Sequence, residues 1–299
     1  MWSLTRGLLV LLWGLIPLLG AQAKGISARD DLGNWVTLPG PAARIISLAP
    51  SATEIVYAAG AGKRLVGVSA YSRWPVEVRR LPRVGDAFRI DLERIVALRP
   101  DLVVAWASAT PPAAREALER LGIPLFLLAP RRLNDIAREI RVMGRLAGTS
   151  RVADRAAGMF VQTKARLARR YSHRRAVTVF YEISAHPLYT VGGRQMISRV
   201  IRLCGGRNIF TRLGRLAPVV EQAAVLARNP QVILTGSGPR VRARLNTWRR
   251  EPWLVAVKAA NLFVVPAGLL GKPAPRILLG AQAVCRALAV ARQRLYGAS

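Results

Sequence analysis

Few residues of this chain are suited to acid–base or metal chemistry. Its 299 residues include only two histidines, His173 and His186, so one chain cannot supply a three-histidine zinc site. Neither a G-x-S-x-G nor an H-E-x-x-H pattern occurs. A secreted α/β hydrolase with a Ser/His/Asp triad stays compatible with the composition, but the chain has no aspartate after His173 to serve as a late triad acid. We therefore expect a non-enzymatic protein with no catalytic residue and no metal site.

Two glycine pairs have the spacing found in nucleotide-binding loops. Gly60-Ala61-Gly62 follows a predicted helix and precedes a predicted strand, which is the reverse of the dinucleotide-binding order. Gly236-Ser237-Gly238 does follow a predicted strand, but Val241 occupies the place of the third glycine. Because glycine is the default residue of tight turns, both pairs are interpreted as turns.

Aromatic residues at the ends of predicted strands are the stronger signal. Tyr71 and Trp74 follow the strand "LVGVS", Trp106 ends the strand "DLVVAW", and Tyr189 lies in "HPLYTVGG". Phe88 lies in the polar turn "GDAFRID". In open α/β sheets, ligands bind outside the carboxyl ends of the strands. A cleft of rigid aromatics suits a large, flat, partly apolar ligand, although each residue taken singly could equally be an ordinary core or surface aromatic.

The elements that would position these aromatics alternate between strand and helix. In the first half, strands are predicted at "RIISLA", "LVGVS", "DLVVAW" and "IPLFLLA", with helices between them. One helix is expected to begin with a capping box, because Ser51 is followed three residues later by Glu54. This alternation predicts an α/β lobe with a largely parallel sheet.

The middle of the chain changes character. "LNDIAREIRVMGRLAG" and "SRVADRAAGMFVQTKARLARRYSHRR" predict two amphipathic helices, and the second is uninterrupted by proline over about 20 residues, or roughly 30 Å. The strand–helix rhythm then resumes and ends in the helix "APRILLGAQAVCRALAVARQRL". We therefore predict two Rossmann-like α/β lobes joined by one long rigid helix.

The first residues have the features of an export signal. Arg6 precedes an apolar run from Gly7 to Gly20, and Ala21-Gln22-Ala23 forms a small-x-small cleavage pattern. The run is short for a membrane span, so a cleaved signal peptide is favoured over an uncleaved anchor. The expected division is residues 1–23 signal peptide, 24–150 N-terminal lobe, 151–172 inter-lobe helix and 173–299 C-terminal lobe.

The only two cysteines, Cys204 and Cys285, lie in the exported part of the chain. Export to an oxidising compartment favours a Cys204–Cys285 disulfide, and two buried free thiols are the alternative. In the simple chain-entropy model such a long closed loop would stabilise the fold by about 4 kcal/mol.

The formal charge of +30 would suit a nucleic-acid-binding protein. Two features oppose that reading, because the signal peptide directs the chain away from nucleic acid and the arginines are spread along it. A solvated basic surface is favoured, and attraction to an anionic membrane or ligand remains open. From His173 onward the only acids are Glu182, Glu221 and Glu251, so each acid there is examined singly.

Four segments, taken together, carry a resemblance to a known family. They are "RIISLAPSATEIVYAAGAGKRLVGVSAYSRWP", "DLERIVALRPDLVVAW", "PLYTVGG…VIRLCGGRNIF" and "PRILLGAQAVC". They resemble the helical-backbone substrate-binding proteins of ABC importers for cobalamin, iron–siderophores and haem, and among these the cobalamin-binding periplasmic proteins. The resemblance implies the fold of a class III periplasmic binding protein: ligand held between the lobes, no catalysis, and a monomer that docks on an inner-membrane ABC permease.

The resemblance also implies roles for single residues. Tyr71 and Trp106 match residues that pack on the corrinoid, Tyr189 matches a cleft aromatic, and Phe88 lies one position from a cleft tryptophan. Where the family has a ligand-contacting aspartate and arginine, this chain has Gly268 and Lys272. The two cysteines fall at the positions of the family's disulfide.

The family also presents one surface glutamate per lobe to arginines of the permease. Glu93 matches the first of these residues, whereas the second falls at Ala223. Glu221 is the substitute two residues earlier, unless it serves only as an acid at a helix N-terminus.

We therefore expect a periplasmic receptor with no bound cofactor, which captures cobalamin or another corrinoid and delivers it to the permease. An iron–siderophore or haem is the alternative ligand, since the positive charge and the missing cleft acid favour an anion. Haem would require an iron ligand such as Tyr71 or His186.

Overall fold

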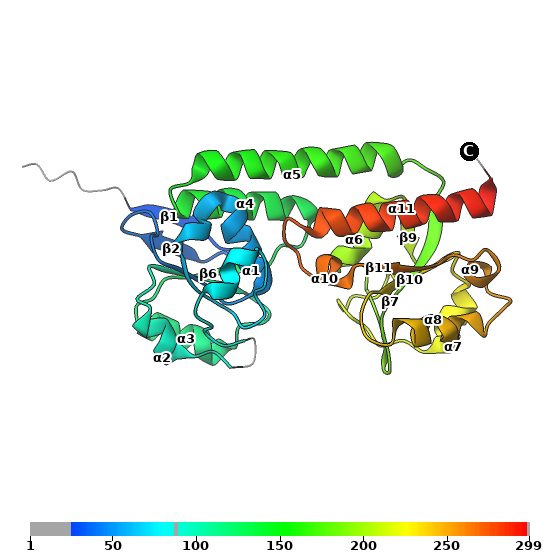
Figure 1. Cartoon of the computed structure of the whole chain (residues 1–299), viewed down its shortest axis with the longest axis horizontal. Coiled ribbons are helices and arrows are strands. Elements are labelled where there is room, and N and C mark those ends of the chain that lie inside the picture. The colour runs from blue at the N-terminus through cyan, green and yellow to red at the C-terminus, as the bar shows by residue number, and fades with distance from the viewer. Residues whose placement is uncertain (1–24, 87–88, 298–299) are drawn as a thin grey trace, which may run out of the picture.

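The computed structural model describes residues 25–86 and 89–297. Figure 1 shows two α/β lobes side by side, with the long helix α5 (Ser150–Tyr171) lying across both. The predicted fold class is confirmed. The expected signal peptide and Phe88 lie outside the described residues. Within the described part of the chain, no helix has the length and apolarity that a membrane span requires.

The N-terminal lobe contains a four-stranded parallel sheet in the order β4-β3-β5-β6. Its strands are β3 (Ile45–Ser47), β4 (Leu65–Val68), β5 (Leu102–Trp106) and β6 (Leu125–Leu128), and its α-helices are α1 (Pro50–Val56), α2 (Leu92–Ala97), α3 (Pro112–Arg120) and α4 (Leu133–Leu146). A π-helical turn (Tyr57–Ala61) and two 3-10 helices (Gly62–Arg64 and Val76–Arg80) connect them. The first four residues of β5 are buried, as expected for a central strand covered on both faces.

An antiparallel hairpin that the sequence reading did not predict precedes this sheet. It consists of β1 (Ile26–Arg29) and β2 (Trp35–Leu38), with Ile26 opposite Leu38. Val36 and Leu38 are buried while Trp35 and Thr37 are exposed. This alternation shows that one face of β2 packs against the lobe and the other face meets solvent.

The helix α5 is positioned by one narrow face. Its buried residues are Ala153, Ala157, Phe160 and Leu167, which recur at helical spacing. It packs against α4, against the π-helical turn and against the closing helix α11 (Ile277–Tyr296). With 22 residues it is about 33 Å long, so one rigid rod contacts both lobes. The division at residues 150 and 172 into separate lobes stays a prediction.

The C-terminal lobe repeats the arrangement around a sheet in the order β11-β10-β7-β8, with β9 also pairing with β7. Its strands are β7 (Val177–Ala185), β8 (Leu188–Thr190), β9 (Gly206–Asn208), β10 (Val232–Gly236) and β11 (Leu262–Val265). Its remaining helices are α6 (Met196–Leu203), α7 (Gln222–Arg228), α8 (Val241–Arg249), α9 (Val255–Lys258) and α10 (Ala267–Leu270). All pairings are parallel except the β7–β8 hairpin.

A disulfide joins Cys204, just after α6, to Cys285 within α11, which confirms the predicted pairing. Both residues are fully buried. The bond therefore ties the helix that closes the chain to the interior of the C-terminal lobe.

The predicted capping box at Ser51 is wrong. Helix α1 begins at Pro50, two residues before the start that a Ser51 N-cap implies, and the fixed φ of proline suits the first helical position. Ala49 is therefore the N-cap, and no side chain caps the helix. Ser51 and Glu54 are instead buried, at 7% and 5% exposure, so Glu54 is an interior carboxylate rather than a capping group.

Candidate ligand-binding cleft

A cavity of about 350 Å³ lies between the two lobes. The N-terminal lobe contributes Leu48, Ala49, Pro50, Ser51, Ser69, Tyr71, Asp86, Trp106 and Ala109, and the C-terminal lobe contributes Gln195, Leu216, Gly271, Lys272 and Pro273. Most of the first group follow the carboxyl ends of parallel strands, where ligands bind in open α/β sheets. The structure therefore brings Tyr71, Trp106 and Lys272 to one site.

The end of one strand and the loop after another present the aromatic side chains of this cleft. Trp106 is the last residue of β5, and its carbonyl oxygen accepts a hydrogen bond from the hydroxyl of Thr110 at 2.9 Å. Tyr71 follows β4 and is 61% exposed, so most of its ring remains open to solvent. Neither aromatic is fully buried in the core, so each has accessible surface that a ligand can contact.

A chain of buried hydroxyl groups anchors the loop that carries Tyr71. Thr53 of α1 lies 2.6 Å from the hydroxyl of Ser47 and 2.8 Å from that of Ser72, measured between oxygens. Ser69 lies 2.8 Å from the same Ser72 hydroxyl. A fully connected polar network in a buried setting holds a single arrangement. The position of Tyr71 is therefore determined by the strand and helix beneath it.

The opposite wall is formed mainly by the loop between α10 and α11. Lys272 is the basic residue of this wall, and Gln195 at the start of α6 lines the cavity beside Leu216. Sequence reasoning did not select Leu48 to Ser51, although they form the turn at the carboxyl end of β3. Gln195 and Leu216 carried no local signal that could have identified them.

Two predicted site residues are not placed in this cavity. Tyr189 lies in β8, where its backbone pairs with that of Val219, and it does not line the cavity. Phe88 lies outside the described residues, although Asp86 of the same turn does line the cavity. The ligand-binding roles of Tyr189 and Phe88 stay predictions.

An ion pair between a buried glutamate and a half-buried arginine lies beside the cleft and spans the two lobes. Arg276, just before α11, places Nη1 3.7 Å from Oε1 of Glu54 in α1. The same guanidinium lies 4.2 Å from the ring centroid of Trp74, a cation–π contact. Burial raises the pKa of Glu54, and the charges of Arg276 and Lys272 oppose that rise.

The two glutamates predicted to dock on a permease lie on the same side of the molecule. Glu93 is in α2 and Glu221 precedes α7, and Figure 1 shows both helices at the edge opposite α5. Both side chains are exposed. Glu221 is the N-cap of α7 by position, but its carboxylate makes no capping hydrogen bond, which leaves it available to a partner.

A metal site in the described part of the chain would require a cluster of ligating side chains such as His, Cys, Asp or Glu. No three His, Cys, Asp or Glu side chains among residues 25–86 and 89–297 lie close enough to hold a metal ion. His186 lines a separate cavity in the C-terminal lobe rather than the cleft.

The sequence of this chain is similar to that of known proteins. The family model described as periplasmic binding protein matches residues 45–265. The vitamin B12-binding protein of Vibrio cholerae serotype O1 is 36% identical over 257 residues, which cover 86% of this chain and 92% of that protein. The vitamin B12-binding protein of Yersinia pestis is 36% identical over 277 residues, covering 92% and 95%.

The fold is also similar to that of solved structures. The crystal structure of the periplasmic vitamin B12 binding protein BtuF of Vibrio cholerae superposes with a TM-score of 0.78 at 36% identity, over 85% of this chain and all of that one. The periplasmic haem-binding protein RhuT of Roseiflexus sp. RS-1 has a TM-score of 0.71 at 23% identity, over 83% and 98%, which shows a shared fold alone. The chain belongs to the periplasmic binding protein family.

Proposed function

We propose that this protein captures cobalamin or a related corrinoid between its lobes and delivers it to an inner-membrane ABC permease. The observation that carries the proposal is the cleft lined by Tyr71 and Trp106 of one lobe and by Lys272 of the other. The relatives at 36% identity, named vitamin B12-binding proteins, support the choice of ligand.

The chemistry of the cleft suits a corrinoid. A corrin ring is broad and flat, so aromatic side chains can cover it at little cost in conformational entropy. Its rim carries amide groups, whose carbonyl oxygens accept hydrogen bonds from an ammonium group such as that of Lys272. These contacts bind and orient a ligand but perform no bond-breaking step.

The setting of the protein follows from the same proposal. Residues 1–23 act as a signal peptide, and the mature chain works as a monomer in the periplasm. Because one rigid helix joins the lobes, loading requires only a small closing motion. The protein is a transport component rather than an enzyme.

Titration of the purified mature protein tests the ligand. Cyanocobalamin is expected to bind at micromolar concentration or below, while haemin and a ferric hydroxamate bind much more weakly. Tyr71→Ala should weaken corrinoid binding, whereas Trp35→Ala should not, because Trp35 is 66% exposed on the β1–β2 hairpin and does not line the cleft. Tight binding of haemin with no corrinoid binding would show that the ligand is haem, while the protein would still be a periplasmic ligand-binding protein.

Docking on the permease is tested by separating capture from delivery. Glu93→Ala and Glu221→Ala are expected to leave corrinoid affinity unchanged and to slow uptake, because rim charges mainly steer association. Asp154→Ala is the matched control: it removes an exposed acid from α5, on the opposite face. Uptake rates in reconstituted vesicles would contradict the docking role if all three variants behaved alike.

A further inference from the structure

The C-terminal lobe contains a second cavity, of about 370 Å³, which we call the C-lobe pocket. Its lining comes from the end of β7, from the loop between β10 and α8, and from one face of α8. Ala267, which starts α10, lines this pocket, while Gly271 and Lys272, which follow α10, line the inter-lobe cleft. The two cavities are therefore neighbours separated by one short helix.

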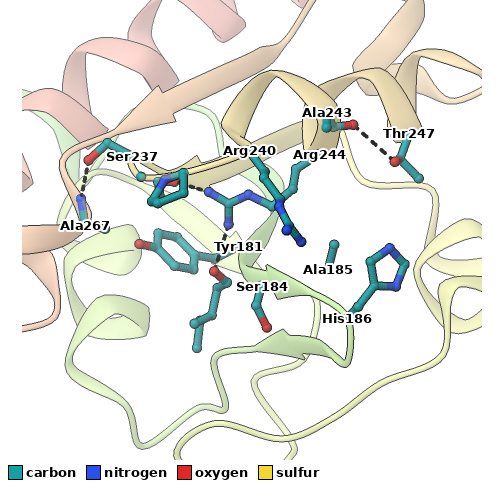
Figure 2. A pocket seen from close by; sticks show the side chains of 14 residues that line it. Tyr181, Ser184, Ala185, His186, Ser237, Arg240, Ala243, Arg244, Thr247 and Ala267 are labelled. Atoms are coloured by element: carbon teal, nitrogen blue, oxygen red, sulfur yellow. Dashed lines mark hydrogen bonds between the residues drawn. The ribbon is translucent and has the colours of Figure 1, made fainter.

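Two arginines give the C-lobe pocket a positive charge. Arg240 and Arg244 line it together with His186, and none of its described lining residues is an acid. In Figure 2 the two arginines extend from α8 into the space between Tyr181 and His186. The nearest described acid, Glu182, is buried at 1% exposure with Oε1 3.8 Å from Nε of Arg244. Burial raises the pKa of Glu182, and its hydrogen bond from Trp248 and the charge of Arg244 oppose that rise.

Arg244 is held in place before any ligand arrives. It donates through Nη1 to the carbonyl oxygen of Ile183 at 2.8 Å and through Nη2 to that of Gly236. These bonds use only part of the five N–H donors of a guanidinium, and they fix its plane. Arg240, by contrast, is exposed and makes no side-chain hydrogen bond with a described residue.

The pocket lies beside the start of α8. Its N-cap is Arg240, in the left-handed region at φ 57°, and no side chain caps the helix. The first N–H groups of an α-helix have no partner within the helix. They carry the positive end of the helix dipole, which attracts anions.

An independent observation is the hydroxyl of Tyr181. Tyr181 is 2% exposed and lines the pocket, yet its hydroxyl makes no hydrogen bond with any described residue. Buried polar groups are normally paired, so an unpaired hydroxyl on the pocket wall is free to donate to a group bound there. Burial raises the pKa of Tyr181 to about 12, so the hydroxyl keeps its proton and can donate it to an acceptor.

We propose that the C-lobe pocket is a binding subsite for an oxyanion, a phosphate or carboxylate group. Arg240 and Arg244 supply the charge, and the Tyr181 hydroxyl supplies a further donor. The subsite rests on the proposed function only for the source of that group. The source is either the phosphodiester of a cobalamin whose corrin ring occupies the neighbouring cleft, or a free anion bound on its own.

Calorimetric titration of ligand-free protein with inorganic phosphate, at constant ionic strength, tests the subsite. Arg240→Ala is expected to weaken phosphate binding about tenfold, the loss of one charge-assisted hydrogen bond. Arg242→Ala is the matched control. It removes the same charge two residues further along the chain, at a position that does not line the pocket. Equal affinity in the wild type and both variants, or equal weakening in both variants, would overturn the proposal.

Tyr181→Phe removes only the unpaired hydroxyl. Because that hydroxyl makes no hydrogen bond within the described fold, we expect an unchanged melting temperature together with weaker phosphate binding. A variant that melts as the wild type and binds phosphate equally well would show that the hydroxyl does not face the anion.

Two corrinoids distinguish the sources. Cyanocobalamin carries the phosphodiester, whereas dicyanocobinamide lacks it. Arg240→Ala should weaken cyanocobalamin but not dicyanocobinamide if the phosphodiester occupies the pocket, and should affect neither if the anion is free. If neither corrinoid binds while Arg240-dependent phosphate binding persists, the proposed function fails and the subsite stands.

Discussion

Trp106 combines two properties that a ligand contact needs. It is half-buried, so its position is fixed by the sheet, and it lines the inter-lobe cleft, so part of its ring can meet a ligand. A tryptophan buried deep in the core has only the first property. Trp248 is such a residue, at 2% exposure, with its indole N–H donated to Glu182 at 2.6 Å.

The Trp106→Ala variant should therefore lose affinity more than stability. Removal of a stacked aromatic from a binding site is expected to weaken corrinoid binding by about 1–3 kcal/mol. Fluorescence titration gives the affinity, and urea unfolding gives the stability. Unchanged affinity with a large fall in stability would identify Trp106 as a core residue instead.

Glu139 of α4 is a buried acid outside the cleft. It is 1% exposed, and its Oε1 lies 2.8 Å from Nη2 of Arg138. The same Nη2 also contacts Asp31. Burial raises the pKa of Glu139 to about 8, with the neighbouring Asp31 acting in the same direction and Arg138 opposing both. The folded state therefore holds a proton that the unfolded state, with a pKa near 4.5, has released.

This difference predicts a pH dependence of stability. Between pH 4.5 and about 8 unfolding releases the proton, so the free energy of unfolding should fall as pH rises. The slope from one group cannot exceed about 1.4 kcal/mol per pH unit. In Glu139→Gln that contribution should be absent, whereas Glu119→Gln, on the exposed side of α3, should keep it. Urea unfolding at several pH values gives the slopes, and equal slopes in all three proteins would contradict the assignment.

At the scale of elements, the disulfide explains how the last helix is retained. Helix α11 contacts α5, α6, α10 and two strands, and Cys285 joins it covalently to the end of α6. The two cysteines are 81 residues apart in sequence. Closing so long a loop restricts the unfolded chain strongly.

Replacing both cysteines by alanine should lower the free energy of unfolding by about 4 kcal/mol. Corrinoid affinity of the folded fraction should be unchanged, because neither cysteine lines the cleft. Chemical unfolding with and without a reductant supplies the measurement. Wild-type protein under reducing conditions should match the variant, and a failure to do so would mean that the substitution itself disturbs the core.

At the scale of the whole molecule, Arg276 forms a direct contact between the two lobes, which α5 also joins. Its guanidinium meets Glu54 and Trp74 of the N-terminal lobe from the start of α11. One oxygen of Glu54 has no hydrogen-bond partner among the described residues. The ion pair therefore depends on the relative position of the lobes.

A double-mutant cycle tests this connection. Arg276→Ala should destabilise the protein by about 1–3 kcal/mol, because it leaves a buried carboxylate without its principal counter-charge. Glu54→Gln introduced into that variant should recover part of the loss, although the same change in the wild type should not stabilise it. Urea unfolding of the four proteins gives the coupling energy. Additive effects would show that the two side chains do not interact in solution.

Much of the fold was predictable, because it depends on local patterns. The strands of the parallel sheets appeared as short apolar runs, and α5 as a long proline-free amphipathic segment. The β1–β2 hairpin was missed because its strands have only four residues each, too few for a clear alternation. The start of α1 was misplaced because Pro50 at the first helical position outweighed the capping signal of Ser51.

The site was only partly predictable. Tyr71 and Trp106 were found because they follow strands, and a strand's carboxyl end is a local property. Gln195 and Leu216 were missed because they reach the cleft from another lobe.

The sequence by itself determined the alternation of strands and helices in the two lobes, the long connecting helix and the only available cysteine pair, since each depends on composition or on short-range periodicity. Only the tertiary structure decided that Glu54 is buried opposite Arg276, that Lys272 and Trp106 line one cleft, and that Tyr181 lines a pocket with two arginines while its hydroxyl makes no hydrogen bond with a described residue. These are contacts between segments far apart in the chain. Their chemistry arises only when folding removes the side chains from water and brings them together.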